Sequence, residues 1–367
     1  MAINLYETRM MLQAIERSLP AQTFLRDTFF PGIQTFVTEK VDVDVKKGKR
    51  KMAPFVARRR GGITVDRGGF STETYTTPYI APQRAITVDD IMNRGLGENI
   101  YSTRTPQERA QELLAKDIAE LDEMITRREE WMCRELLLNG VVTIKGWVDR
   151  VDGGADYVED VIDFQFTNVE TLAGGAAWDQ STSKKIDDLK RIRLSIIQKT
   201  GKNPNVIIMA NNVVDLFLSD EDVRTLFDIR NITLGSIQPR IQMDGVTYVG
   251  TLNALGLEIY TYDEWFLDDD GREQPMIPDD HLIMASTGLG SRLYGAVTQM
   301  EEADGQFHTY EGTRVPRVWS DINNDVKMIR LASRPLPKPE DVDSWYVLKV
   351  KDETETETET ETETETE

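Results

Sequence analysis

The sequence predicts an α+β fold, and three observations lead to that prediction. One long helix with sequence signals at both ends is expected over residues 106–139. Stretches of alternating polar and apolar residues before and after it indicate extended hairpins. A further stretch of about 150 residues combines amphipathic helix patterns with short apolar runs, as a compact mixed α/β domain does.

Bulk composition indicates a soluble protein that depends on packing and association for its stability. The chain has 367 residues and 40% hydrophobic content, enough for a sizeable core. It shows neither a signal peptide nor the roughly 18 uninterrupted apolar residues of a membrane-spanning helix, so we expect it to stay in the cytoplasm that makes it. A single cysteine, Cys133, leaves no partner for an intrachain disulfide or a cysteine metal cluster.

Charge is distributed unevenly along the chain. The formal net charge is -20, and residues 352–367, with nine acids, form a low-complexity Thr-Glu tail that we expect to be disordered. By contrast, residues 46–60 contain eight Lys or Arg and no acid. The acidic balance disfavours nonspecific binding of nucleic acid, because each phosphate contact needs a cation.

The first 88 residues are expected to form an arm followed by a projecting loop. Residues 1–35 show a short helix pattern that ends near Pro20, and we interpret them as an N-terminal arm. Residues 36–88 begin with the alternating string VTEKVDVDV and contain few large apolar residues, which indicates a long β-hairpin with little core of its own. Two glycine pairs are the predicted hinges of this loop: Gly61, Gly62, Gly68 and Gly69.

The basic part of this loop is the main candidate site. Its predicted role is to contact the acidic surface of a neighbouring copy, since arginine forks suit carboxylates. Two alternatives remain open: a nucleic-acid site, which the lone aromatic Phe55 supports weakly, and a solvated loop with no specific partner. The candidate contact residues are Lys46, Lys47, Lys49, Arg50, Lys51, Arg58, Arg59 and Arg60.

The predicted long helix has clear boundaries. Thr105 is the expected N-cap, Pro106 occupies the first helical position, and Glu108 completes a capping box. Gly140 fits the left-handed residue that follows the last turn. Apolar residues recur every three or four positions, so a rod of about 50 Å needs a long platform to pack against.

The remaining elements follow in a regular order. Residues 141–166 alternate around Gly153-Gly154 as a second hairpin, and an amphipathic helix that Gly201 and Pro204 close leads to a buried strand at 206–210. We expect one helix, capped by Asn211 or Asn212, to run to Phe227. A hairpin turn at Asp244-Gly245, strands at 257–262 and 281–286, and a closing strand, proline-rich turn and final strand complete the prediction.

No catalytic, cofactor or metal site is expected. His281 and His308 lie in neither a metal nor a triad spacing. The acidic run at 268–270 lacks the ligand spacing of a calcium loop, and the glycine-bearing segment from Thr287 lacks a phosphate-binding motif. A thiol buried in a helix, as we expect for Cys133, is usually inert.

Four segments, and the order of the elements, carry a resemblance to a known family. The segments are MAPFVARRRGGITVDRGGF, YTTPYIAPQRAITVDDI, RREEWMCRELLLNG and NNDVKMIRLASRPLPKP. The chain resembles phage major capsid proteins of the lambda type, the major capsid protein E family, which have the Hong Kong 97 capsid fold. The resemblance extends to about Lys349, and the acidic tail departs from it.

The resemblance implies an arm at 1–35, an extended loop at 36–88, a peripheral domain at 89–177 with its spine helix at 106–139, an axial domain at 178–320, return strands at 321–350 and a tail at 351–367. It also implies a non-enzymatic subunit that assembles with itself in the host cytoplasm. Pentamers and hexamers would form an icosahedral procapsid around a scaffolding protein, with a portal and a decoration protein as further partners. The mature virion shell would enclose double-stranded DNA.

Three alternatives stay open at this point. A compartment shell protein of the encapsulin type would share the fold. A DNA-binding protein that uses residues 46–60 would show affinity that falls steeply with salt. A cytoplasmic enzyme would show a thermal shift with its substrate.

Overall fold

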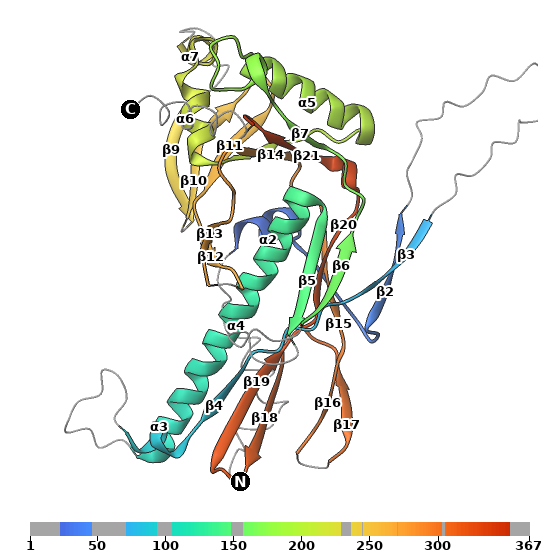
Figure 1. Ribbon diagram of the computed structural model, residues 1–367, viewed down its shortest axis with the longest axis vertical. Coiled ribbons are helices and arrows are strands. Elements are labelled where there is room, and N and C mark those ends of the chain that lie inside the picture. Colours follow the sequence, from blue (N-terminus) through green and yellow to red (C-terminus); the bar gives the residue numbers. More distant parts are fainter. Residues whose placement is uncertain are drawn as a thin grey trace, which may run out of the picture.

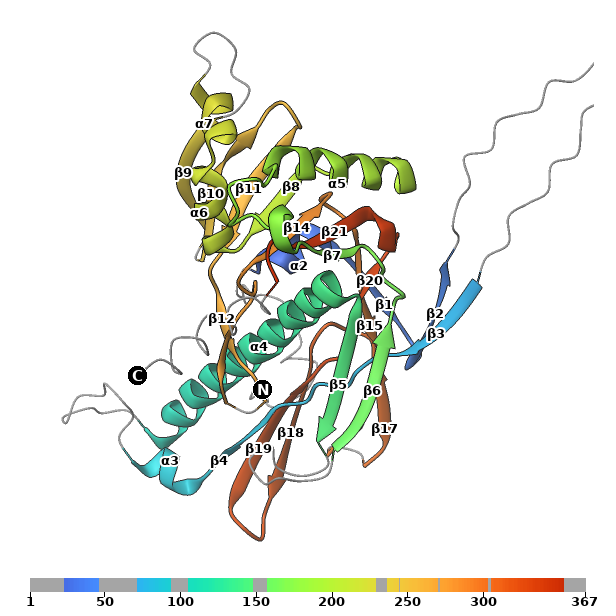
Figure 2. The same ribbon diagram turned by 45° about the horizontal axis from the view of Figure 1, so that its top comes forward.

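The computed structural model describes residues 23–45, 71–93, 105–147, 157–228, 236–243, 245–269, 271–302 and 305–352. A sheet flanked by helices lies at one end of the molecule, and the long helix α4 runs away from it (Figure 1). A hairpin projects sideways from the body in both views (Figures 1 and 2). In the described residues no helix is both long and apolar enough to span a membrane.

The largest sheet has seven strands of mixed direction. In spatial order they are β7 (Val169–Thr171), β21 (Trp345–Lys349), β14 (His281–Ala285), β8 (Val206–Met209), β11 (Leu257–Tyr262), β10 (Val246–Leu252) and β9 (Ser236–Met243). β8 pairs parallel with β11 and antiparallel with β14. All four residues of β8 are buried, which fits the continuous apolar run VIIM. The strands predicted at 206–210, 257–262 and 281–286 correspond to β8, β11 and β14.

Helices flank this sheet: α5 (Lys185–Thr200), α6 (Asn211–Ser219), α7 (Glu221–Asp228) and the short 3-10 helices η2 (Gly174–Ala176) and η3 (Val342–Ser344). α5 ends at Gly201, whose φ of 81° is left-handed as expected. The single helix predicted to run to Phe227 is wrong. Asp220 has an extended backbone that interrupts it, and its carboxylate accepts the N–H groups of Asp222 and Val223.

The predicted asparagine cap of α6 is also wrong. Ala210 is the N-cap residue, and no side chain caps it. Asn211 donates to the carboxylate of Asp263 at 2.5 Å, and Asn212 donates to that of Asp280 at 2.7 Å. Both amides therefore bind across the fold because distant carboxylates compete with the local helix end.

The long helix α4 (Pro106–Asn139) has the predicted bounds. Thr105 accepts the N–H of Glu108 at 3.3 Å and Glu108 accepts that of Thr105 at 2.8 Å, so the capping box forms. Gly140 follows with φ 69°, and its missing side chain makes room for Phe166. The helix ends at this position because the backbone turns left-handed at Gly140, a conformation that glycine tolerates.

One platform for α4 is a three-stranded sheet, in the order β18 (Val315–Asp321), β19 (Val326–Ala332) and β4 (Gln83–Ile86). Val318, Ile329 and Leu331 form a hydrophobic cluster with Leu114 and Leu121 of α4. The short helix α3 (Val88–Met92) follows β4 and has its own capping box on Thr87. The far half of α4 joins the main core through Met132, Leu136 and Leu137.

A second three-stranded sheet contains a segment that was predicted to be a turn. Its strands are β1 (Gly32–Phe36), β15 (Gly290–Gly295) and β20 (Pro335–Pro339). The segment PLPKP was predicted to be a turn and is instead the strand β20, paired antiparallel with β15. Proline lacks an N–H donor, and an edge strand tolerates this because one side of it makes no ladder bonds. The short helix α2 (Phe24–Phe29) precedes β1.

Four hairpins complete the fold: β2 (Lys40–Val45) with β3 (Ser71–Thr76), β5 (Val141–Trp147) with β6 (Tyr157–Asp163), β12 (Trp265–Leu267) with β13 (Glu273–Pro275), and β16 (Val297–Met300) with β17 (Phe307–Tyr310). The first of these is the described part of the predicted extended loop, and the second is the predicted hairpin after the long helix. The short helix expected before Pro20 lies outside the described residues.

Candidate assembly surfaces

The predicted contact residues and hinge glycines all lie in residues 46–70, outside the part of the chain that the structure describes. They are Lys46, Lys47, Lys49, Arg50, Lys51, Arg58, Arg59 and Arg60, with Gly61, Gly62, Gly68 and Gly69. The structure does describe the two strands that carry them. Lys40 pairs with Thr76 and Val45 pairs with Ser71, so the ends of the segment leave the hairpin side by side.

The root of this hairpin is fixed to the body. The ring of Tyr75 packs against that of Phe164 at a tilt of 35° with centroids 5.0 Å apart, and the Tyr75 hydroxyl donates to the carbonyl of Asp163 at 3.2 Å. Glu39 forms an ion pair with Arg334 at 2.6 Å, and the hydroxyl of Thr77 donates to the carbonyl of Glu39 at 2.9 Å. Beyond this root the hairpin projects from the molecule (Figure 2). The hairpin therefore offers surface for contact with another molecule.

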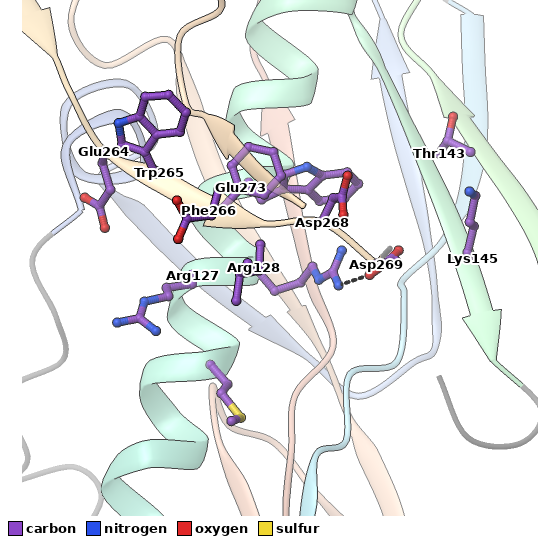
Figure 3. Close-up of a pocket in the computed structure, with 13 residues that line it drawn as sticks. Arg127, Arg128, Thr143, Lys145, Glu264, Trp265, Phe266, Asp268, Asp269 and Glu273 are labelled. Carbon is purple, nitrogen blue, oxygen red and sulfur yellow. Dashed lines mark hydrogen bonds and ion pairs between the residues drawn. The ribbon is translucent and has the colours of Figure 1, made fainter. Parts of the chain in front are cut away.

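A groove of about 710 Å³ lies between α4, β5 and the β12–β13 hairpin (Figure 3). Three large apolar side chains on it are strongly exposed: Met124 at 48%, Trp265 at 59% and Leu267 at 66%. A contiguous patch of exposed apolar side chains marks a surface on which another molecule packs.

Charged residues hold the two sides of the groove together. Arg128 of α4 forms an ion pair with Asp269 at 2.6 Å and lies over the ring of Trp131 at 5.0 Å. Arg134 lies over the ring of Phe266 at 5.2 Å and donates to the carbonyl of Met276. Asp268 accepts the N–H of Arg272 at 2.8 Å, so both Asp268 and Asp269 make structural contacts.

A buried charge cluster lies beneath these surfaces, where α4 meets three other segments. Arg314 donates to Asp122 and Glu129, each at 2.6 Å, and to the hydroxyl of Thr126 at 3.1 Å. Arg26 of α2 reaches the other oxygen of Glu129 at 3.1 Å. Burial alone would lower the pKa of Arg314, but the charges of Glu129 and Asp122 raise it above its ordinary value.

Glu130 joins the amino-terminal end of α2 to α4. Its carboxylate oxygens accept the backbone N–H groups of Leu25 at 2.8 Å and Arg26 at 2.9 Å, and the hydroxyl of Tyr262 at 3.0 Å. Burial raises the pKa of Glu130 to about 7, although these three donors and the charge of Arg26 act in the opposite direction. Sequence patterns missed this cluster because its partners lie about a hundred or more residues apart.

The other candidate sites in the sequence do not form a functional cluster. Their residues have structural roles or lie on separate elements. Cys133 is buried in α4, and burial, followed by the charge of Glu130, raises the pKa of its thiol. His281 and His308 lie on separate strands, β14 and β17. Gly290 of the glycine-bearing segment lets β15 approach β20, since a Cβ there would lie 2.0 Å from the carbonyl oxygen of Lys338. Among the described residues no group of acids, histidines and cysteine could hold a metal ion.

Comparison with solved structures identifies the class of fold. A prophage protein of Escherichia coli CFT073, described as a capsid protein, superposes with a TM-score of 0.65 at 20% identity, covering 93% of this chain and 98% of that one. A phage-related protein of Bordetella bronchiseptica RB50 gives 0.52 at 10% identity, covering 93% and 96%. The molecule has the Hong Kong 97-like fold of phage capsid subunits.

The sequence comparisons then give the family. The model of phage major capsid protein E matches residues 7–350, so the chain belongs to that family of structural proteins. The major capsid protein of Enterobacteria phage P21 is 23% identical over 357 residues, which are 95% of this chain and all of that protein. A P21 prophage-derived major head protein of Escherichia coli O6:H1 matches equally well. The predicted fold class and the predicted major capsid function, as a component of the virion, are confirmed.

Proposed function

We propose that copies of this chain form the pentamers and hexamers of an icosahedral procapsid, assembled in the host cytoplasm and later filled with double-stranded DNA. Membership of the capsid family carries this proposal. The projecting β2–β3 hairpin supports it, since a segment fixed only at its root needs a neighbour to bury its surface. Many modest contacts of this kind add through multivalency.

We propose further that the loop at 46–60 docks on the groove of a neighbouring copy. The loop carries eight positive charges, and four acids line the groove: Glu264, Asp268, Asp269 and Glu273. Three cations lie among them, Arg127, Arg128 and Lys145, of which Arg128 is paired with Asp269. Opposite charges steer two surfaces together and set their register, while the exposed Trp265 and Leu267 offer apolar area for burial. The pairs Gly61-Gly62 and Gly68-Gly69 would let the loop move when the shell expands.

A scaffolding protein, a portal and a decoration protein are the expected partners, and we propose that the chain itself catalyses no reaction. The division into an arm, an extended loop, a peripheral domain, an axial domain, return strands and a tail remains part of this proposal.

Electron microscopy of the purified full chain tests the assembly, with and without a co-expressed scaffolding protein. Light scattering on the same samples gives the mass. Rings, tubes or closed shells are the expected result. A monomer under every condition, with the scaffold present, would contradict the proposal and return the enzyme and DNA-binding alternatives to consideration.

A further inference from the structure

Two arginines lie side by side on the outer face of the sheet formed by β4, β19 and β18. β18 and β19 pair antiparallel with Arg317 opposite Arg330 and Trp319 opposite Met328, so these four side chains share one face. The opposite face carries Val318 and other apolar residues that pack on α4. The arginine face is therefore the one opposite to α4, and its other end, at Val315 and Ala332, packs on Val297 of β16.

Both arginines lie against a single aromatic ring. The guanidinium carbon of Arg317 lies 5.1 Å from the ring centroid of Trp319, and that of Arg330 lies 5.9 Å from it. All three side chains are partly exposed. Trp319 thus holds two like charges next to each other, an arrangement that repels unless an anion lies between or above them. We name Arg317, Trp319 and Arg330 the arginine platform.

Neither arginine of the platform has a carboxylate partner among the described residues. The Nε of each is buried and makes no hydrogen bond. Arg330 reaches only the amide oxygen of Gln299, at 3.5 Å. Two acids near the platform are already engaged, since Asp321 accepts from Asn324 at 2.7 Å and Glu301 accepts from Gln299 at 2.9 Å.

The lack of a carboxylate partner for Arg317 and Arg330 among the described residues is unusual in so acidic a chain. With a net charge of -20, carboxylates greatly outnumber the cations, and many arginines in the described residues form ion pairs. Examples are Arg26, Arg84, Arg128, Arg191, Arg314 and Arg334. Two adjacent arginines without such a partner form a site to which an anion from elsewhere can bind.

We propose that the arginine platform binds the acidic segment 352–367 of another copy of the chain. That segment carries nine carboxylates in a strict Thr-Glu alternation. An extended peptide with this period presents its carboxylates on one side, and arginine binds a carboxylate with two parallel hydrogen bonds. The proposal does not depend on shell formation, because any two copies of the chain together supply both the platform and the acidic segment.

The position of the segment favours a second copy over the same one. Lys351 forms an ion pair with Asp280 at 3.5 Å, which holds the start of the segment beside β21 and β14. Those strands lie in the seven-stranded sheet, whereas β18 and β19 lie toward the opposite end of the molecule in both views (Figures 1 and 2). Fifteen residues follow Asp352, and a chain of this length spans at most about 50 Å, which is a length sufficient to contact a neighbouring copy.

A peptide titration tests the proposal. The protein is the full chain with the eight glutamates of residues 353–367 changed to glutamine, which keeps its length and removes competition from its own tail. The probe is a fluorescein-labelled peptide of residues 352–367, followed by fluorescence anisotropy in low-salt buffer. We expect saturable binding that weakens as salt is added. The change R317Q/R330Q should raise the Kd about fivefold.

A matched control uses two arginines that likewise have no carboxylate partner in the part of the chain that the structure describes. Arg193 donates to the side chain of Asn203, and Arg224 donates to the carbonyl of Leu218. The variant R193Q/R224Q removes the same total charge and should leave the Kd unchanged. If R317Q/R330Q alters the circular dichroism spectrum, R317K/R330K replaces it. That variant keeps the charge but loses the bidentate geometry, and should still raise the Kd about twofold.

Three outcomes would overturn the proposal. One is the absence of peptide binding at low salt, and another is an equal loss of affinity in the platform and control variants. The third is a platform variant that loses affinity for a duplex oligonucleotide while it keeps its affinity for the peptide. That result would assign the two arginines to phosphate groups and exclude the tail as their ligand.

Discussion

Glu130 makes the stability of the subunit depend on pH. Its folded-state pKa of about 7 lies above the ordinary 4.5, so between these pH values the folded chain keeps a proton that the unfolded chain has lost. Stability therefore falls as the pH rises from about 4.5 to about 7, and the contribution of this group is constant above that. The difference in pKa corresponds to about 3 kcal/mol.

The variant E130Q should remove this dependence. Glutamine does not titrate, so the fall in unfolding free energy between pH 4.5 and pH 7.5 should shrink by about 3 kcal/mol. Urea denaturation at a series of pH values measures it. E170Q is the matched control: burial would raise the pKa of Glu170, but hydrogen bonds from Arg191 and Tyr346 lower it, so this change should not flatten the same slope. An E130Q profile parallel to the unmodified one would contradict the assignment.

We expect the buried ion pairs of Arg314 to contribute strongly to the stability of the subunit. The variant R314M removes the cation that pairs with the buried Asp122 and one of the cations that pair with Glu129, and should cost about 3 kcal/mol or more. Adding D122N removes one of the uncompensated charges, so the double variant should be less destabilised than the sum of the two single changes. Guanidinium denaturation of the four proteins completes the cycle. Additive losses would show that the two side chains are energetically independent.

Among the elements, α4 depends most on a single residue at its end. At Gly140 a left-handed backbone coincides with a close neighbour, since a Cβ would lie 2.0 Å from that of Phe166. Gly256 has a similar φ of 66° and open space around it. Comparing alanine substitutions at Gly140 and Gly256 separates the free-energy cost of the left-handed backbone from that of the steric clash with Phe166.

We therefore expect G140A to destabilise the subunit more than G256A. The control should lose roughly 1 kcal/mol through the left-handed conformation alone. G140A should lose clearly more, because Phe166 stacks on Trp345 at 4.6 Å and cannot shift without disturbing the core. Thermal unfolding of both variants measures the difference. Equal losses would mean that Phe166 moves aside freely.

Elements were predictable where their signals lie close together in the chain. Both ends of α4 and the carboxyl-terminal end of α5 follow from caps within a few residues, and these were predicted correctly. The break at Asp220 and the strand β20 were not, because they depend on contacts across the fold. β20 becomes a strand only because β15 lies beside it, although three of its five residues are prolines.

For the whole molecule, the proposed loop contact gives a test of assembly. The variant R58E/R59E/R60E should leave the subunit folded and block shell formation, because it places negative charge against the acids of the groove. R58K/R59K/R60K keeps the charge and should still assemble. Electron microscopy with the scaffolding protein compares them, and intact shells from the glutamate variant would refute the loop contact.

A charge reversal on the other side sharpens this test. Glu273 lies on β13 and is exposed in the groove. Combined with R58E/R59E/R60E, E273K should restore part of the assembly if the loop and the groove meet. Failure of this rescue, together with shells from the single E273K variant, would place the loop on another surface.

The sequence by itself determined the α+β class, the long capped helix, the hairpin that carries the basic loop and the membership of a capsid family. These features are encoded in local periodicity, in caps and in segments that resemble the family, all of which can be read along the chain. Only the tertiary structure decided the charge cluster around Glu129, the groove beside α4 and the arginine platform. Each brings together residues from separate elements, and their spacing in sequence carries no information about that contact.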